Sequence, residues 1–415
     1  MSDATEKRSG GAEPQTYVMP LNVKLLALAS LLNDIASETV YPLLPKFLLS
    51  TLGGNRFWLG AIEGLADSLA SLLKIQFGAW SDRARNRKPF VVVGYLVAAL
   101  ARPLHAAVST PSQLLSARLG DRFGKGVRTA ARDALISDSS PPAIRGRAFG
   151  FHRAMDHLGA AIGPVLATLY LLVWPDALRS LFLLTAIPGA IVVIVLWCGL
   201  REPERHGSES VSGSSTPKPF DKNFIRFLVA MLLFTLGNSS DAFLLVRAEE
   251  VGVPVVYLPL LWAVFHVAKS VGNLIAGSWV DRIGPRTMLF VGWGFYATIY
   301  LAFAVATSRT AVIALFATYA VYYALTEPAE KTMVSLLVPR SRSGAAYGWF
   351  HGAIGFAALP SSMIFGGLYE RWGYTIAFGF GALQAVIAMS VLLAVRSPCT
   401  NADGDGSIIS VRGGD

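Results

Sequence analysis

The chain has 415 residues, of which 53% are hydrophobic and only 15% are charged. Soluble domains carry about 25% charged residues, so this composition excludes a water-soluble globular protein and favours an integral membrane protein. The net charge is 36 − 27 = +9. In so apolar a chain we assign this excess to loops on one side of a bilayer and not to nucleic-acid binding. The two cysteines offer no disulfide framework, and no cofactor or metal motif is found.

Apolar runs of roughly 20 residues, long enough to cross a bilayer as a helix, follow one another along the chain. The polar residues 1–18 are expected to form a disordered cytoplasmic tail, as are residues 397–415. The Ser-, Pro- and charge-rich stretch 201–223 predicts a cytoplasmic linker between six-helix bundles over 19–200 and 224–396. The predicted spans are 21–49, 57–80, 89–109, 112–134, 146–173, 179–200, 224–246, 254–280, 286–307, 309–335, 345–369 and 373–395.

Lysine and arginine side chains indicate how these spans are oriented. Pairs or clusters of cations occupy alternate loops on one side, for example Arg85 with Arg87, Arg145 with Arg147, and Arg340. The opposite loops carry only isolated cations. Because cationic loops stay in the cytoplasm, the sequence predicts a multi-pass protein with both termini cytoplasmic, and we expect it in a bacterial inner membrane.

A short charged segment occurs twice. GAWSDRARNRKPF at 78–90 returns as GSWVDRIGPRTMLF at 277–290, after the second and the eighth predicted span. The offset of the glycines, 277 − 78 = 199, equals that of the aspartates, 281 − 82 = 199. Internal duplication of this kind is typical of secondary transporters, whose substrate site lies between the repeats near the bilayer midplane.

The repeated segment resembles the cytoplasmic loop signature of the major facilitator superfamily. The resemblance implies twelve transmembrane helices in two pseudo-symmetric bundles and a small-molecule substrate. It also implies a conformational latch, in which a helix-end carboxylate meets guanidinium groups and helix termini. The alternative reading of the segment is a topology signal alone. Arg85 and Asn86 depart from the family pattern in the first copy. The latch candidates are Gly78, Asp82, Arg83, Arg87, Gly277, Asp281, Arg282 and Arg286.

The fourth span carries seven charged residues between Arg118 and Asp133. A charge facing lipid at mid-bilayer costs about 3 kcal/mol or more, so seven would cost roughly 20 kcal/mol, above the roughly 5–15 kcal/mol that stabilises an ordinary domain. At about 100° per residue the seven fall within an arc of roughly 140°. We therefore expect this face to look into a polar interior, while the glycine-containing opposite face packs closely.

Carboxylates in the neighbouring spans can partner these cations. A buried carboxylate beside a cation can exchange its partner for a proton, which is the chemistry of a proton-driven carrier. Arg122 and Gly126 also resemble the fourth-span Arg-x-x-x-Gly motif of the superfamily, whose arginine is tied to coupling in proton-coupled members. A fixed salt-bridge network that only holds the bundle together is the alternative. The proton-coupling candidates are Asp34, Glu38, Glu63, Asp67 and Arg122.

Other polar residues inside the spans are candidates for contact with substrate. They come from both halves, as expected for a cavity between the bundles. The candidates are Asn33, Lys74, Arg102, Arg118, Lys125, Asn238, Asp241, His266, Lys269, Tyr323 and Glu327. A single histidine such as His266 is more often a structural group than a ligand.

Gly159-x-x-x-Gly163-Pro164 in the fifth span resembles a superfamily motif associated with antiporters. We therefore expect a proton-coupled secondary transporter that exports a small organic compound. A carrier of an anionic substrate, such as an organic acid or siderophore, is the alternative, since the cationic face of the fourth span would attract it. A non-transporting membrane receptor or assembly partner is a third possibility. No catalytic motif points to an enzyme, and the protein is expected to be a monomer.

Overall fold

The structure, a computed structural model, describes residues 17–44, 47–54, 56–203, 220–238, 241–254 and 258–396. Within these ranges the regular elements are helices, and no strand is present. Nearly all of the two predicted tails, and the linker residues 204–219, lie outside the described residues.

Six passes form the first half of the chain, and the last of them consists of two short helices. They are α1 (Leu21–Val40), α3 (Arg56–Arg83), α4 (Lys88–Leu104), α5 (Pro111–Ser139), α6 (Arg145–Val173) and α7 (Leu178–Leu184) with α8 (Ala186–Gly199).

Six more passes form the second half. They are α9 (Lys222–Gly237) with α10 (Ala242–Glu250), α11 (Leu258–Ile283), α12 (Pro285–Val305), α13 (Arg309–Leu337) and α14 (Ser343–Leu393). Gly373 has a φ of 82° and divides α14 into two passes. Seven helical segments of the described ranges are apolar and long enough to cross a membrane, and the charged α5 is not among them.

Two predicted spans end early or break where proline interrupts the hydrogen-bond ladder. The span predicted over 21–49 ends as an α-helix at Val40, and a 3-10 turn containing Pro42 follows. The span predicted over 179–200 breaks at Thr185. Pro188 lies just beyond and cannot donate to the Leu184 carbonyl, so the helix is interrupted there, although Leu178–Gly199 together remain long and apolar enough to cross a membrane.

The span predicted over 224–246 is also broken. The α9 helix ends at Gly237, and Asn238 has a non-helical ψ of 88° before α10 begins. Glycine followed by asparagine is a common helix C-terminal sequence. Asn238 and Asp241 therefore lie in a break between two helices and not inside a continuous span.

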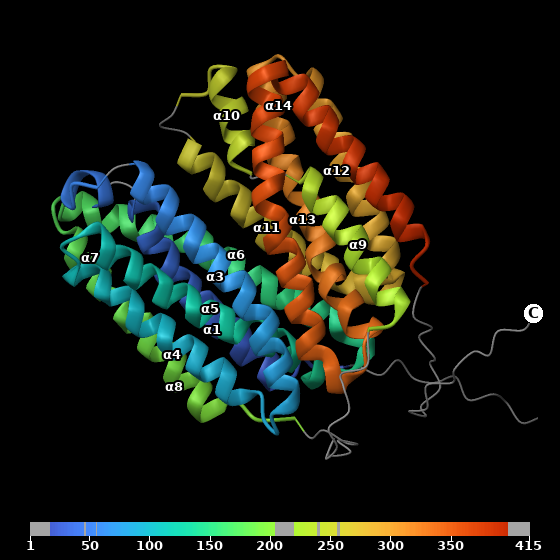
Figure 1. Cartoon of the computed structure of the whole chain (residues 1–415), viewed down its shortest axis with the longest axis horizontal. Helices are drawn as coiled ribbons and strands as arrows, with labels where there is room; N and C mark the ends of the chain where they lie inside the picture. The colour runs from blue at the N-terminus through green and yellow to red at the C-terminus, as the bar shows by residue number, and fades with distance from the viewer. Residues whose placement is uncertain are drawn as a thin grey trace, which may run out of the picture.

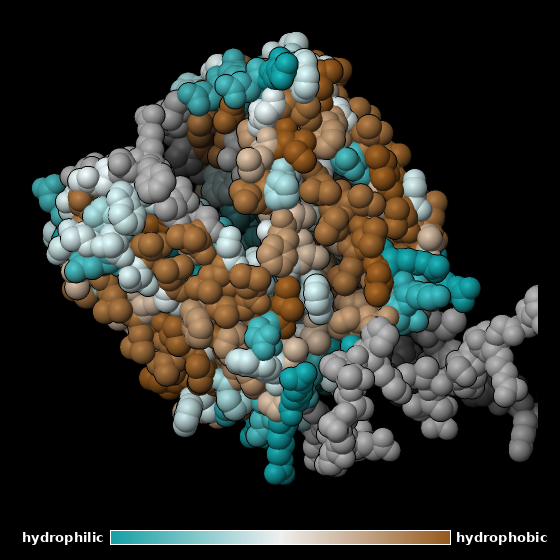
Figure 2. All heavy atoms as spheres, in the orientation of Figure 1, coloured by the Kyte–Doolittle hydropathy of each residue, from teal (hydrophilic) through white to brown (hydrophobic). Residues whose placement is uncertain are grey.

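The two groups of helices lie side by side and separate toward the end that carries α7 and α10 (Figure 1). At the other end they are joined by two helix pairs, since α3 of the first half packs on α14 and α11 of the second half packs on α6. On the face of the molecule that Figure 2 shows, apolar side chains dominate the outer surface of both groups. Leu172, Trp197 and Met363, for example, expose 73%, 68% and 69% of their surface, as expected for helices in contact with lipid.

The charged face of α5 is turned inward, as predicted. Arg118, Asp121, Arg132 and Asp133 are all buried. On another side of the helix, Gly124 packs so closely on α4 that a Cβ atom there would lie 2.5 Å from the Gly94 carbonyl oxygen. The glycine thus allows the two helices to approach one another.

The loop that joins the two helices is shorter in the second copy of the repeat than in the first, and we attribute the difference to Gly284. Gly284 has a φ of 93°, and α12 begins immediately after it at Pro285. The equivalent position is 284 − 199 = 85, where the sequence has Arg85. A side chain with a Cβ atom disfavours positive φ, and here the chain needs four residues before α4 begins at Lys88.

Replacing Gly284 by alanine is expected to destabilise the protein by about 1 kcal/mol or more, because alanine would be strained at this φ. Thermal unfolding in detergent measures the effect. The matched control is Gly367→Ala in α14, where no atom lies within 4 Å of the added Cβ and the backbone is helical. The control should be neutral or slightly stabilising, and equal losses in the two variants would contradict the strain argument.

Candidate functional site

A cavity of about 330 Å³ lies between the two halves. The space-filling view shows the molecule hollowed between the two groups of helices, with hydrophilic side chains inside (Figure 2). The residues that line it come from both halves and are Asp34, Lys74, Lys125, Arg128, Thr129, Arg132, Arg153, Asp156, Met231, Phe234, Thr235, Asn238, Tyr322, Tyr323, Thr326, Glu327, Glu330, Lys331, Phe350, His351 and Ile354.

The first of two ion clusters that join the halves is centred on Asp133 of α5, which is fully buried. Lys331 of α13 places its Nζ atom 2.9 Å from the Asp133 carboxylate, and His351 of α14 donates to the same oxygen at 2.7 Å. Arg132 binds the other oxygen at 3.1 Å. One carboxylate of the first half thus holds two side chains of the second half.

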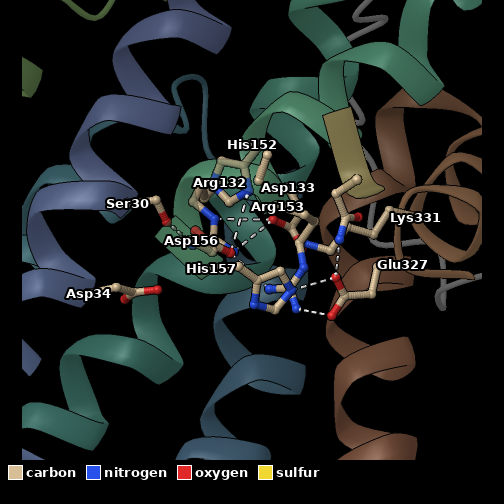
Figure 3. A network of polar contacts seen from close by, with 12 residues as sticks. Ser30, Asp34, Arg132, Asp133, His152, Arg153, Asp156, His157, Glu327 and Lys331 are labelled. Carbon is tan, nitrogen blue, oxygen red and sulfur yellow. Dashed lines mark hydrogen bonds and ion pairs between the residues drawn. The ribbon is translucent and has the colours of Figure 1, made fainter. Parts of the chain in front are cut away.

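The second cluster is the reverse of the first, because its central carboxylate belongs to the second half. Glu327 of α13 is ion-paired with Arg153 of α6 and hydrogen-bonded to His157 at 2.7 Å (Figure 3). Asn273 of α11 also donates to it at 3.0 Å. Arg153 is further fixed by Asp156 at 2.8 Å.

The repeat in the sequence explains why Asp133 meets Lys331. The helices α5 and α13 begin at 111 and 309, an offset of 198, and the two residues have the same offset, 331 − 133 = 198. Positions related by a pseudo-two-fold axis touch one another only beside that axis. The Asp133–Lys331 pair therefore marks the axis between the halves.

The predicted latch aspartates each bind the first amides of a helix in the other half. Asp82 accepts from the backbone N–H groups of Gly344 and Ala345 at 2.8 and 2.6 Å. Asp281 accepts from those of Gly146 and Arg147 at 2.6 and 2.8 Å. A carboxylate at a helix N-terminus satisfies free N–H groups and the helix dipole, so each contact stabilises the closed end of the cavity.

The predicted latch glycines allow this close approach. A Cβ atom on Gly78 would lie 2.3 Å from the Gly344 carbonyl oxygen, and one on Gly277 would lie 2.8 Å from that of Gly146. Any larger residue would push the halves apart at this end.

The first latch has a counter-cation that the second does not share. Arg87 is fully buried and binds Asp82 at 2.5 Å, Asp138, and the backbone carbonyl of Arg340 in the second half. Its equivalent Arg286 instead donates to the Leu393 carbonyl, within its own half. Arg83 and Arg282 are exposed. The latch role of all eight residues stays a prediction.

At the opposite end, arginines hold the helices within each half. Arg179 donates to the carbonyls of Ala106 and Val108, and Arg247 donates to that of Ala306. The structure is therefore latched at the end that carries the cationic loops.

Five of the eleven predicted substrate contacts line the cavity, namely Lys74, Lys125, Asn238, Tyr323 and Glu327. Three others belong to a separate cluster in the first half. There Arg102 binds Asp121 and Asn33 at 2.9 Å, and Arg118 lies 4.8 Å from the centre of the Tyr41 ring. Asn33, Arg102 and Arg118 therefore do not line the cavity.

The remaining three, Asp241, His266 and Lys269, form an aromatic cluster in the second half. The Tyr323 hydroxyl lies 2.9 and 2.8 Å from Oδ1 and Oδ2 of Asp241 and donates its one hydrogen to that carboxylate. The Lys269 ammonium lies 3.4 Å from the centre of the Tyr323 ring, and His266 packs against Trp262. These side chains position Tyr323, which itself reaches the cavity.

Among the proton-coupling candidates, Asp34 lines the cavity, whereas Glu38, Asp67 and Arg122 do not. Arg122 pairs with Asp67 at 3.2 Å. The Glu63 side chain lies outside the described part of the structure.

The cavity is also lined by Arg153, Asp156 and Glu330, which lie in spans where the sequence places polar groups, and by His351, which the sequence did not single out. The repeat carried a signal for one of them. Phe149 and Tyr347 are offset by 198, and the same offset pairs Arg153 with His351.

Comparison with known proteins agrees with this architecture. The family model of the major facilitator superfamily matches residues 26–268 and 224–406. The chain belongs to the major facilitator superfamily. An MFS-type transporter of Methanocaldococcus jannaschii is 32% identical over 90% of this chain and 94% of its own length.

Solved structures of superfamily members share the fold. The human organic anion transporter MFSD10 superposes with a TM-score of 0.74 at 17% identity, over 90% of this chain and 99% of its own. The transporter FucP in its outward conformation superposes with a TM-score of 0.75 at 15% identity, over 90% and 98% of the two chains. At these identities the likeness establishes the fold alone.

Proposed function

We propose that this member of the superfamily is a secondary active transporter that works by alternating access, is coupled to protons, and exports a small organic compound. The observation that carries the proposal is the charged cavity between two halves that are latched at one end only. Charged groups inside a membrane protein are costly unless they serve transport or are paired, and a two-sided site between repeats is the usual location of the substrate.

The latched end carries the cationic loops around Arg87, Arg145 and Arg340. With cationic loops in the cytoplasm, the described state has its cavity facing outward, in a bacterial inner membrane with both termini cytoplasmic. The export direction is supported by the Gly159-x-x-x-Gly163-Pro164 motif. Gly159 and Gly163 lie against α1, where added Cβ atoms would meet the Leu31 and Ile35 carbonyl oxygens at 2.5 and 2.8 Å, so the motif positions the helix that carries Asp34.

Flux in proteoliposomes tests this proposal. A panel of small organic acids, amines and neutral dyes is offered to vesicles that contain a pH indicator, under an imposed pH gradient. Proton movement opposite to that of the transported compound supports proton-coupled export. Absence of flux for compounds that bind the purified protein would contradict a carrier and favour a receptor.

Asp34 is the carboxylate that we assign to proton coupling, because it faces the cavity and its described hydrogen-bond partner is a neutral amide, Asn33 at 2.9 Å. Asp34→Asn is expected to abolish transport driven by a pH gradient while substrate counterflow continues. Asp176→Asn is the control, since Asp176 is exposed and does not line the cavity, and it should retain the pH dependence. Gradient-driven flux that persists unchanged in Asp34→Asn would exclude Asp34 as the proton carrier.

A carrier of anionic substrates is the second candidate. It is favoured by Lys74 and Lys125, two cavity cations that have no ion-pair or hydrogen-bond partner among the described side chains.

A further inference from the structure

The charged cavity residues divide into a paired and an unpaired set. Arg132, Arg153 and Lys331 each lie within ion-pair distance of a carboxylate. Lys74 of α3 and Lys125 of α5, on helices that pack side by side, have no such partner in the described part of the chain. Lys125 is exposed and Lys74 is half-buried, and both line the cavity, so their ammonium groups are accessible to an anion that enters from solution.

Arg128 adds a third positive charge beside them. Its guanidinium lies 4.4 Å from the centre of the Tyr95 ring and 3.5 Å from the Gly94 carbonyl oxygen, so neutral groups hold it in place. The cavity wall of the first half is therefore cationic where Lys74, Lys125 and Arg128 meet it.

The opposite wall is mainly apolar near α9 and α14. Met231 and Phe234 come from α9, and Phe350 and Ile354 come from α14. Tyr322 and Asn238 are hydrogen-bonded to one another at 3.2 Å and add a polar edge to this wall. An aromatic or aliphatic body would pack here without burying an unpaired polar group.

Two carboxylates of the cavity bear on the sign of the ligand. Asp34 accepts a hydrogen bond from Asn33, and Glu330 of α13 lies beside the paired Lys331. They lie in different halves and on different helices. Lys74, Lys125 and Arg128, which have no carboxylate of the described residues within ion-pair distance, lie together on α3 and α5. The grouping favours one anionic head group over a cationic one.

We propose that the central cavity binds an amphiphilic organic monoanion, with its anionic group at Lys74 and Lys125 and its apolar body against Phe234, Phe350 and Ile354. This inference rests on the carrier function proposed above and names its substrate class. The cavity volume of about 330 Å³ is at the lower end of the range of about 300–1,000 Å³ usual for small-ligand sites, which suits a compound of one or two rings.

Binding to the purified full-length protein tests the inference without any need for flux. The probes are 2-naphthoate, its neutral amide, the cationic 2-naphthylmethylamine, and acetate, which lacks the ring system. Isothermal calorimetry is expected to show 2-naphthoate binding at least about tenfold more tightly than each of the other three. Amine or amide binding as tight as that of 2-naphthoate would overturn the anion site.

Variants of Lys74 and Lys125 test whether these lysines bind the anionic group of the ligand. Lys74→Gln combined with Lys125→Gln should weaken 2-naphthoate binding about 10- to 100-fold and leave amide binding nearly unchanged. Lys125→Arg, which keeps the charge, should retain most of the anion affinity, and this comparison separates a binding role from misfolding. Undiminished 2-naphthoate affinity in the double variant would overturn the assignment.

A variant of the apolar wall tests the other half of the site. Ile354→Asn should weaken 2-naphthoate binding but not acetate binding. If 2-naphthoate binds as expected but no probe is transported, the site stands and the carrier function fails. If other compounds are transported and 2-naphthoate does not bind, the carrier function stands and the anion site fails.

Discussion

Replacing Asp133 by asparagine is expected to produce the largest loss in the molecule, lowering stability by about 3–5 kcal/mol, the usual cost of leaving a buried charge without its partner. The substitution leaves Lys331 and Arg132 buried without the carboxylate that both bind, and it also removes the His351 contact between the halves. Thermal and denaturant unfolding in detergent measure the stability, and flux in proteoliposomes should fall with it.

A compensating substitution separates the lost ion pair from general disruption. Asp133→Asn combined with Lys331→Met removes one charge of each sign, so the double variant should be more stable than Asp133→Asn alone. Asp176→Asn, at an exposed position, is the matched control and should change stability by less than about 0.5 kcal/mol. An Asp133→Asn protein as stable as this control would contradict the central role of the cluster.

Replacing Asp82 by asparagine is expected to open the latched end. The carboxylate accepts from two backbone amides and from Arg87, and hydrogen bonds to charged groups contribute about 1.5–3 kcal/mol each. A loss of about 3 kcal/mol would shift the ratio of latched to open molecules by about 10²-fold. The expected consequence is slower transport with little change in ligand affinity, because Asp82 does not line the cavity.

Spin labels at two exposed sites that flank the latched end report this shift. Asn86 belongs to the first half and Ser341 to the second, and both are exposed. Pulsed electron–electron double resonance should show a longer distance between the two spin labels in Asp82→Asn than in the unsubstituted protein. The effect of Asp281→Asn should be smaller, since no described arginine binds Asp281 through its side chain as the buried Arg87 binds Asp82. An unchanged distance distribution in both variants would contradict the latch and leave the segment as a topology signal.

The passes and the inward turn of α5 could be predicted from the sequence because both follow from the cost of placing polar groups in lipid. In lipid, a run of apolar residues has its lowest free energy as a membrane-spanning helix. A helix with charges on one face has its lowest free energy with that face turned away from lipid. The breaks near Pro188 and after Gly237 were not predicted, because an apolar run can remain in the membrane on either side of a break.

The site was less predictable, for a different physical reason. The sequence indicates which helix face a side chain occupies, but it does not indicate which oppositely charged group lies beside that side chain. Arg102 and Lys125 are both cations in neighbouring spans, yet Arg102 is neutralised by Asp121 and Lys125 reaches the cavity. His351 gave no signal by itself, since one histidine in an apolar span has many structural uses, and only the repeat offset connects it to Arg153.

The pairing beside the pseudo-two-fold axis has a consequence for how the two halves recognise one another. Arg132 and Asp133 in α5 correspond, at an offset of 198, to Glu330 and Lys331 in α13, so the order of charges is inverted between the repeats. Two copies of the first half would bring aspartate against aspartate at the position where Asp133 now meets Lys331. If the halves were expressed as separate polypeptides, the mixed dimer should therefore form in preference to either homodimer. One half alone could no longer assemble into the symmetric dimer that preceded the duplication.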